Sequence, residues 1–208
     1  MGRYFIKWDG EDYTALYSGV LADEQYISKE IGTVNFKVAD NVTNTSYKTK
    51  DGDAAFHEKG TRLFSIEGQE DLLAVKDESV VNGYRVYSAK EDTENKWDFN
   101  NLPLDKVQHI EIYLAYTQEG PKQLANLKDD EDIARFLELL YSSEENLAFQ
   151  PNTTNGDPIY YEVVLYTGEP IAYQYGVQFD GTTYYWHPWE TAIIAEDIKQ
   201  FIPETPRY

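Results

Sequence analysis

The stretch YFIKWDGEDYTAL, residues 4–16, decides how the first part of the chain folds. Its Asp9-Gly10 pair lies between two short segments with strand character, and Asp-Gly in this position is a strong signal for a two-residue hairpin turn. Such a turn fixes which residues lie opposite each other in the two strands: Trp8 and Glu11, Lys7 and Asp12, and Ile6 and Tyr13. The stretch is therefore predicted to form a β-hairpin.

Further short strands are expected after this hairpin, separated by turn residues. Their sequences are TVNFKV (33–38), TRLFSIEG (61–68), LLAVKD (72–77) and YRVYSA (84–89). TVNFKV alternates, with Val34, Phe36 and Val38 predicted to point inward. LADEQYISKEIG (21–32) is expected to contain one helical turn. Residues 1–90 are therefore predicted to form a β-rich module, either a small barrel or a sandwich.

The rest of the chain is predicted to be a linker and a mixed second module. Charged residues, asparagines and a proline make residues 91–105 the expected linker. Residues 106–208 contain a strand at 106–116, a helix at 128–142 with acidic residues at its N-terminus, three strands, and a last helix from about Trp189 to Ile202 with Ile194, Ile198 and Phe201 on one face. The predicted fold class is α+β, a β-rich N-terminal module followed by an antiparallel sheet with two helices on one face.

A second hairpin, PIAYQYGVQFDGTTYYWH at 170–187, carries the candidate binding residues. A two-residue turn at Asp180-Gly181 pairs Phe179 with Thr182, Val177 with Tyr184, and Tyr175 with Trp186. Tyr184 and Trp186 are then expected in the core. Tyr185, opposite Gly176, and His187 lie on the polar face and are the predicted ligand-binding residues; the alternative is an ordinary exposed sheet face.

Composition excludes several function classes. Among 208 residues, 18 are basic and 37 acidic, so the net charge is −19 and nucleic acid is not an expected partner. An anionic membrane surface would also repel the chain unless a covalent anchor held it there. The chain has no cysteine, which excludes disulfides, thiol nucleophiles and thiolate zinc sites.

Asp51-Gly52-Asp53 resembles the start of a calcium-binding loop but fails its spacing rules. In an EF-hand that starts at Asp51, Ala55 supplies no ligand, Phe56 replaces the required glycine and Arg62 replaces the bidentate glutamate. We expect a turn here, with another calcium geometry, built from backbone carbonyls and distant carboxylates, as the alternative. The three histidines have no metal-ligand spacing, and no nucleotide-binding or serine-hydrolase motif occurs. No metal, cofactor or catalytic residue is predicted.

Four motifs in the first half carry a resemblance to a family. They are the W-x-G-x-x-Y pattern of residues 8–13, IGTV (31–34), DGDA (51–54) and GTRLFSIEG (60–68), followed by LLAV (72–75). Over roughly residues 4–88 the chain resembles exported lipoproteins and uncharacterised exported proteins of Firmicutes. The second half resembles, more by pattern than by identical residues, small domains appended to other Firmicute envelope proteins.

This resemblance implies a location outside the cytoplasmic membrane, with a lipid anchor that holds the acidic chain there. A signal segment with a lipid-modified cysteine is absent from this sequence, and the Met1-Gly2 start suggests that it has been removed. We expect a non-catalytic envelope protein, an interaction or sensor module that binds a protein or a cell-wall glycan. The alternatives are a glycan-binding module that uses exposed aromatic rings and a hydrolase that uses aspartate and glutamate.

Overall fold

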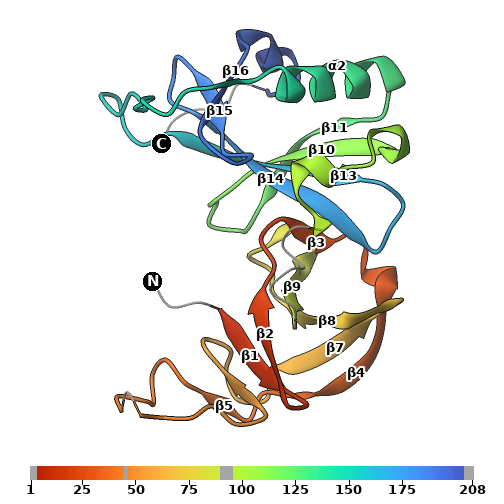
Figure 1. The fold of residues 1–208 in the computed structure, drawn as a ribbon, viewed down its shortest axis with the longest axis vertical. Coiled ribbons are helices and arrows are strands. Elements are labelled where there is room, and N and C mark those ends of the chain that lie inside the picture. Colours follow the sequence, from red (N-terminus) through yellow and green to blue (C-terminus); the bar gives the residue numbers. More distant parts are fainter. Residues whose placement is uncertain (1–3, 45, 90–95, 204–208) are drawn as a thin grey trace. The chain divides into compact units, whose positions relative to one another are not determined.

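The computed structural model describes residues 4–44, 46–89 and 96–203 (Figure 1). The chain forms two compact units, Met1–Trp97 and Asp98–Tyr208, and each is described by itself. The expected start of the linker, residues 91–95, and the Met1-Gly2 start lie outside the described residues. No helix in the described ranges is long and apolar enough to span a membrane.

The first unit is a single curved sheet with eight strands. Its strands are β1 (Phe5–Trp8), β2 (Glu11–Ala15), β4 (Ile27–Thr33), β5 (Phe36–Lys37), β6 (Asp53–Ala54), β7 (Arg62–Ile66), β8 (Gln69–Lys76) and β9 (Tyr84–Ser88). They lie in the order β4-β7-β8-β9-β2-β1-β6-β5. The short strand β3 (Gly19–Leu21) and the 3-10 turns η1 (Glu24–Tyr26) and η2 (Val81–Gly83) lie between them in the chain. The helical turn expected in residues 21–32 is η1.

The two end strands of this sheet come from one continuous stretch of chain, residues 27–37. Its first part, β4, pairs with β7, and its last part, β5, pairs in parallel with β6. At the joint, Val34 N donates to Thr61 O at 2.8 Å and Asn35 N donates to Gly52 O at 2.7 Å. Since one stretch pairs at both ends of the sheet, the sheet must curl, and it forms a half-barrel around a core that includes Ile6, Val34, Leu63, Leu73 and Tyr87.

The predicted β1–β2 hairpin is confirmed in every pair. Trp8 lies opposite Glu11, Lys7 opposite Asp12, and Ile6 opposite Tyr13. Asp9 and Gly10 both have positive φ angles, 50° and 80°, which match the turn that suits the right-handed twist of the strands. The two-residue turn alone determines this register, so the register can be predicted from the sequence.

The second unit is also built on one sheet, and a helix covers one face of it. Its strands are β10 (His109–Leu114), β11 (Lys122–Leu127), β12 (Glu144–Glu145), β13 (Ile159–Tyr166), β14 (Ile171–Phe179), β15 (Tyr184–Trp186) and β16 (Ala192–Ile194). They lie in the order β11-β10-β13-β14-β15-β16-β12. Figure 1 shows α2 (Asp130–Tyr141) across one face of this sheet.

The helix α2 is the element that the sequence predicted at 128–142. Asp129 is its N-cap and accepts a hydrogen bond from Glu131 N at 3.0 Å, while three acidic residues in the first turn suit the helix dipole. The apolar residues at helical spacing, Ile133, Phe136, Leu137 and Leu140, are buried, together with Leu139. This face packs against the apolar side of the sheet, to which Ile110 and Ile112 belong.

The predicted fold class is wrong. The described chain is mostly β, with two large sheets and α2, and the helix expected at Trp189–Ile202 does not form. Its residues instead make strand β16 and the 3-10 turn η5 (Glu196–Gln200). Ile194, Ile198 and Phe201 are buried as expected, but Ile194 pairs with Tyr184 in the sheet. The spacing of Ile194, Ile198 and Phe201 is therefore compatible with a strand followed by a 3-10 turn as well as with a helix.

For the second hairpin, the prediction of which side chains share a face of the sheet is correct, but the predicted pairing register is wrong. Phe179 lies opposite Tyr184 and Val177 opposite Trp186, so the pairing is shifted by two residues and the loop has four residues, 180–183. A shift of two residues keeps each side chain on its predicted face. Tyr184 and Trp186 are therefore buried as expected, although Tyr185 faces Gln178 rather than Gly176.

A buried carboxylate explains the longer loop. Asp180 Oδ1 accepts hydrogen bonds from Thr182 N (2.9 Å) and Thr183 N (2.8 Å), and its Oδ2 accepts from Asn152 N (2.8 Å). Burial raises the pKa of Asp180, but these hydrogen bonds outweigh that effect, so the pKa lies below its ordinary value. Such a turn needs four residues, which the Asp-Gly rule does not foresee.

Part of the expected linker is packed into the second unit. Phe99, in the 3-10 turn η3 (Phe99–Asn101), lies with its ring centroid 4.5 Å from Tyr141 and 4.8 Å from Trp186. A second turn, η4 (Leu104–Lys106), follows. The polar composition of residues 91–105 predicted a linker, but Phe99 within this segment packs against aromatic residues of the second unit.

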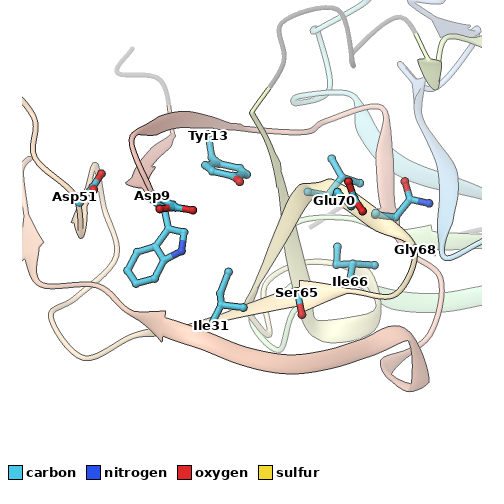
Figure 2. A pocket seen from close by; sticks show the side chains of 11 residues that line it. Asp9, Tyr13, Ile31, Asp51, Ser65, Ile66, Gly68 and Glu70 are labelled. Carbon is cyan, nitrogen blue, oxygen red and sulfur yellow. The ribbon is translucent and has the colours of Figure 1, made fainter.

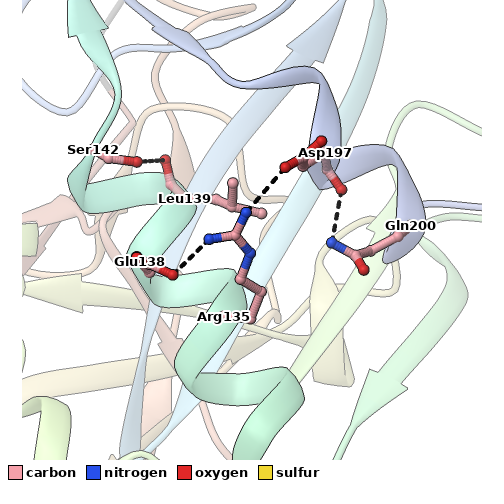
Figure 3. A network of polar contacts seen from close by, with 6 residues as sticks. All are labelled: Arg135, Glu138, Leu139, Ser142, Asp197 and Gln200. Carbon is pink, nitrogen blue, oxygen red and sulfur yellow. Dashed lines mark hydrogen bonds and ion pairs between the residues drawn. The ribbon is translucent and has the colours of Figure 1, made fainter.

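Polar contacts on the surface join α2 to η5 (Figure 3). Arg135 donates to Glu138 Oε2 at 2.6 Å and to Asp197 Oδ2 at 3.0 Å, and Gln200 donates to the Asp197 carbonyl at 3.0 Å. Beneath them Ile198 is fully buried. Exposed ion pairs contribute little to stability, so burial of Ile198 is the contact that fixes η5.

The first prediction compares these two contributions. Ile198→Ala should lower the free energy of unfolding by about 2–4 kcal/mol because it leaves a cavity in the core. Arg135→Met, which removes both ion pairs, should leave stability almost unchanged. Urea denaturation followed by circular dichroism measures both variants. A loss for Arg135→Met as large as that for Ile198→Ala would contradict this view of η5.

The second prediction concerns the Asp180 turn. Asp180→Asn places an amide where Asn152 N needs an acceptor, and should cost about 1–3 kcal/mol at neutral pH. Because the folded-state pKa is below the ordinary value of 3.8, the carboxylate stabilises the fold above that value and loses this effect as the pH falls through the folded-state pKa. The stability gap between the two proteins should therefore be constant near neutrality and shrink below about pH 4. A gap that widens on acidification would refute the assignment.

Candidate functional site

The candidate site lies at the end of the half-barrel where the β1–β2 hairpin approaches β4. Trp8, at the end of β1, lies directly over Gly32 of β4, although these strands are far apart in the order of the sheet. A Cβ atom at Gly32 would collide with the outer ring of the Trp8 indole. Glycine is therefore required at this position by close approach, and the indole closes the gap between the two strands.

Asp51 holds the tip of the β1–β2 hairpin through a hydrogen bond. Gly10 N donates to Asp51 Oδ1 at 2.9 Å. Lys7 Nζ donates to Gly10 O at 2.7 Å and lies 3.4 Å from Asp12, so the hairpin also has contacts of its own. These interactions hold the Trp8 side of the site in one position.

A pocket of about 710 Å³ lies between the hairpin and strands β4, β7 and β8. Trp8, Tyr13, Ile31, Ile66 and Leu72 supply its apolar lining, and Ser65, Gly68 and Gln69 complete it together with three carboxylates, Asp9, Asp51 and Glu70. Figure 2 shows Tyr13 and Ile31 on opposite sides of the opening, with Asp51 toward one end and Glu70 toward the other. We call this the Trp8–Tyr13 pocket.

The pocket is strongly acidic. No lysine, arginine or histidine is among its described lining residues, while three carboxylates are. Burial raises the pKa of the Tyr13 hydroxyl, and the negative charges of Asp71, Asp9 and Glu11 raise it further. The phenol therefore stays neutral and available as a hydrogen-bond donor, in a region that favours positive charge.

The sequence did not point to this pocket, although part of the signal was present. The predicted hairpin register already places Trp8 and Tyr13 on the face that carries Ile6. Ile31, Ser65 and Glu70 come from other strands and meet the hairpin only because the sheet curls. No local pattern predicts that curvature.

Asp51 and Asp53, the residues of the candidate calcium loop, both act as hydrogen-bond acceptors. Asp51 accepts from Gly10, and buried Asp53 Oδ2 accepts from Tyr47 Oη at 2.7 Å and from Lys50 N at 2.8 Å. Gly52 has a positive φ of 90°, as the expected turn requires. Within the described residues, no three histidine, aspartate or glutamate side chains are grouped so that they could hold a metal ion.

Tyr185 and His187, the predicted ligand-binding residues, lie side by side. Their ring centroids are 5.8 Å apart, and His187 Nδ1 is 3.1 Å from Thr191 Oγ1. Tyr185, however, is only 2% exposed, with Phe149 at 4.9 Å and its hydroxyl donating to Gln178 at 2.8 Å. The prediction that Tyr185 lies on an exposed face is therefore wrong, because Phe149, from a loop distant in sequence, covers it. Its role in binding stays a prediction.

Glu111 in β10 is the centre of a second polar cluster. Its Oε2 accepts from Tyr113 (2.6 Å) and Tyr166 (2.7 Å), and its Oε1 accepts from Asn126 (2.8 Å). His109 stacks on Tyr166 with centroids 4.2 Å apart. Burial, followed by the hydrogen bond to Glu111, raises the pKa of Tyr113. A carboxylate that accepts three hydrogen bonds is well satisfied, so the cluster reads as a structural network.

Comparisons with known proteins give no match: neither a family model, nor a curated protein, nor a solved structure is found to resemble the chain.

The third prediction tests how the pocket is built. Gly32→Ala should displace the Trp8 indole and lower the free energy of unfolding by about 1–3 kcal/mol, with a change in tryptophan fluorescence. Gly176→Ala is the matched control, since Gly176 is also a strand glycine but has open space where the Cβ would lie. Denaturant melts of both variants give the comparison. Equal effects at the two positions would mean that Trp8 does not depend on Gly32.

Proposed function

We propose that this chain is a non-catalytic binding protein of the cell envelope, an interaction or sensor module that holds its ligand in the Trp8–Tyr13 pocket. The observation that carries the proposal is the pocket itself. It combines two aromatic side chains, an apolar lining and open carboxylates at one end of a half-barrel. Barrel mouths with an apolar lining and a few polar groups are common binding sites.

The roles of the carboxylates support binding rather than catalysis. Asp53, Asp180 and Glu111 accept two or more hydrogen bonds each from neighbouring groups and serve the fold. Asp77 does the same, with Arg85 Nε at 2.8 Å and Ser79 Oγ at 2.6 Å. Among the described residues that line the pocket, none is a histidine or lysine that would serve as a proton-transfer partner to Asp9 or Glu70.

The envelope location belongs to the proposal and comes from the sequence. The W-x-G-x-x-Y, DGDA and GTRLFSIEG motifs resemble exported Firmicute lipoproteins. With a net charge of −19, a lipid anchor rather than the protein surface would supply the attraction to an anionic membrane.

Glycan binding on an outer aromatic surface has weaker support. Many of the rings are buried, and the two exposed neighbours Tyr116 and Tyr160 meet at an interplanar angle of 80°. Sugar rings stack on flat, roughly coplanar surfaces, which this pair does not offer. Trp189 is 78% exposed, but no ring contact to it is found among the described residues.

The fourth prediction tests whether the pocket binds. In nitrogen-15 NMR titrations with short peptides, small amines and wall oligosaccharides, at least one ligand class should shift the Trp8 indole and Gly68 amide signals. Ser65→Phe, which fills the pocket, should abolish these shifts, whereas Ser28→Phe on the exposed surface of β4 should not. Glycoside and ester substrates should show no turnover. Absence of pocket shifts with every class would refute the binding function, and turnover would refute the non-catalytic one.

A further inference from the structure

We propose that the Trp8–Tyr13 pocket selects an organic cation, an ammonium or guanidinium group carried on an apolar chain. This inference rests on the proposed binding function and names the class of ligand. Its starting point is that the pocket joins features that usually serve different ligands: aromatic and aliphatic walls, and a rim of negative charge.

The aromatic walls suit a cation. The negative faces of tryptophan and tyrosine rings attract ammonium and guanidinium groups, and tryptophan does so most strongly. Trp8 and Tyr13 come from the two strands of one hairpin and both line the pocket. Trp8 is held by its contact with Gly32, so the wall exists before a ligand arrives.

The carboxylates come from three separate segments of the chain. Asp9 lies in the β1–β2 turn, Asp51 in the turn before β6, and Glu70 in β8. Asp51 Oδ1 is used by Gly10 N, which leaves its second oxygen for a ligand. Figure 2 shows Asp9 and Asp51 toward one end of the pocket and Glu70 toward the other, so a cation at either end would have a carboxylate beside it.

Three positive groups on neighbouring elements are already engaged. Lys7 pairs with Asp12, and Arg62 lies 3.6 Å from Glu30 with its guanidinium over Phe64. Lys96 Nζ lies over the Trp97 ring and is 3.5 Å from Gln69 Oε1. Asp71 and Glu11 add negative charge near Tyr13, and these charges, after burial, help to raise the pKa of Tyr13. The balance of charge around the pocket is therefore negative.

The apolar lining distinguishes an organic cation from a metal ion. Ile31, Ile66 and Leu72 offer no oxygen ligands, whereas calcium requires six to eight of them. An alkyl chain can lie on these residues while its charged end meets the rim. A volume of about 710 Å³ accommodates a lysine or arginine side chain, or a free alkylamine.

The fifth prediction uses ligands that differ only in charge. A short peptide with a central lysine and the same peptide with norleucine in its place are titrated by NMR, alongside n-butylammonium and calcium chloride. The lysine peptide should shift the Trp8 indole and Tyr13 signals and lose affinity at high salt, and the norleucine peptide should bind at least about tenfold more weakly. Shifts with n-butylammonium of similar strength identify a free amine as sufficient; much weaker shifts assign the cation to a peptide side chain.

Matched variants locate the effect. Asp9→Asn keeps the positive φ angle that aspartate and asparagine both tolerate, and Glu70→Gln keeps the side-chain length. Each should weaken lysine-peptide binding about threefold, and the two together about tenfold. Glu78→Gln removes an exposed charge that does not line the pocket, and should change nothing.

The outcomes separate this inference from the binding function. Equal binding of the norleucine and lysine peptides, or pocket shifts with a wall oligosaccharide alone, would overturn the cation inference and leave a binding pocket. Calcium that reproduces the shifts at micromolar concentration would overturn it in favour of a metal site. If no ligand shifts the NMR signals of the pocket residues, both proposals are overturned.

Discussion

The contact between the Trp8 indole and the backbone of Gly32 is the constraint on which the first unit depends. The sheet has its ends, β4 and β5, in one stretch of chain, so it must curve until the middle of that stretch meets β1. The indole fills the space where the curve closes, and only glycine leaves room for it. The pocket is a consequence of this closure, because Trp8 forms its wall and β4 its opposite side.

The acidic composition of the chain has two separate consequences. Several carboxylates act inside the fold as hydrogen-bond acceptors for backbone N–H groups, as Asp180 and Asp53 do. These hold turns in place and are no sign of chemistry. Asp9 and Glu70 instead lie exposed at the pocket, where they create a field that favours positive ligands. The count of 37 acidic residues could not separate these two groups.

Local signals account for what could be predicted from the sequence. Asp9-Gly10 specified a complete hairpin register, and the 3.6-residue period of Ile133, Phe136 and Leu140 specified α2. Prediction failed where distant contacts decide. The Asp180 side chain bonds to Asn152 and lengthens a loop, Phe149 covers Tyr185, and Ile194 joins the sheet instead of a helix. The pocket also depends on contacts between residues distant in sequence, because its walls meet only when the sheet is complete.

The central claim is that Trp8 packs on Gly32 and thereby shapes the site. NMR of the intact protein tests it directly through the nuclear Overhauser effects of the Trp8 indole. The structure predicts strong effects between the Hη2 and Hζ2 protons of Trp8 and the Hα protons of Gly32. These residues belong to β1 and β4, which are far apart in the strand order of the sheet. An indole that shows no effect to Gly32, and contacts only its own hairpin, would contradict both the closure of the half-barrel and the pocket built on it.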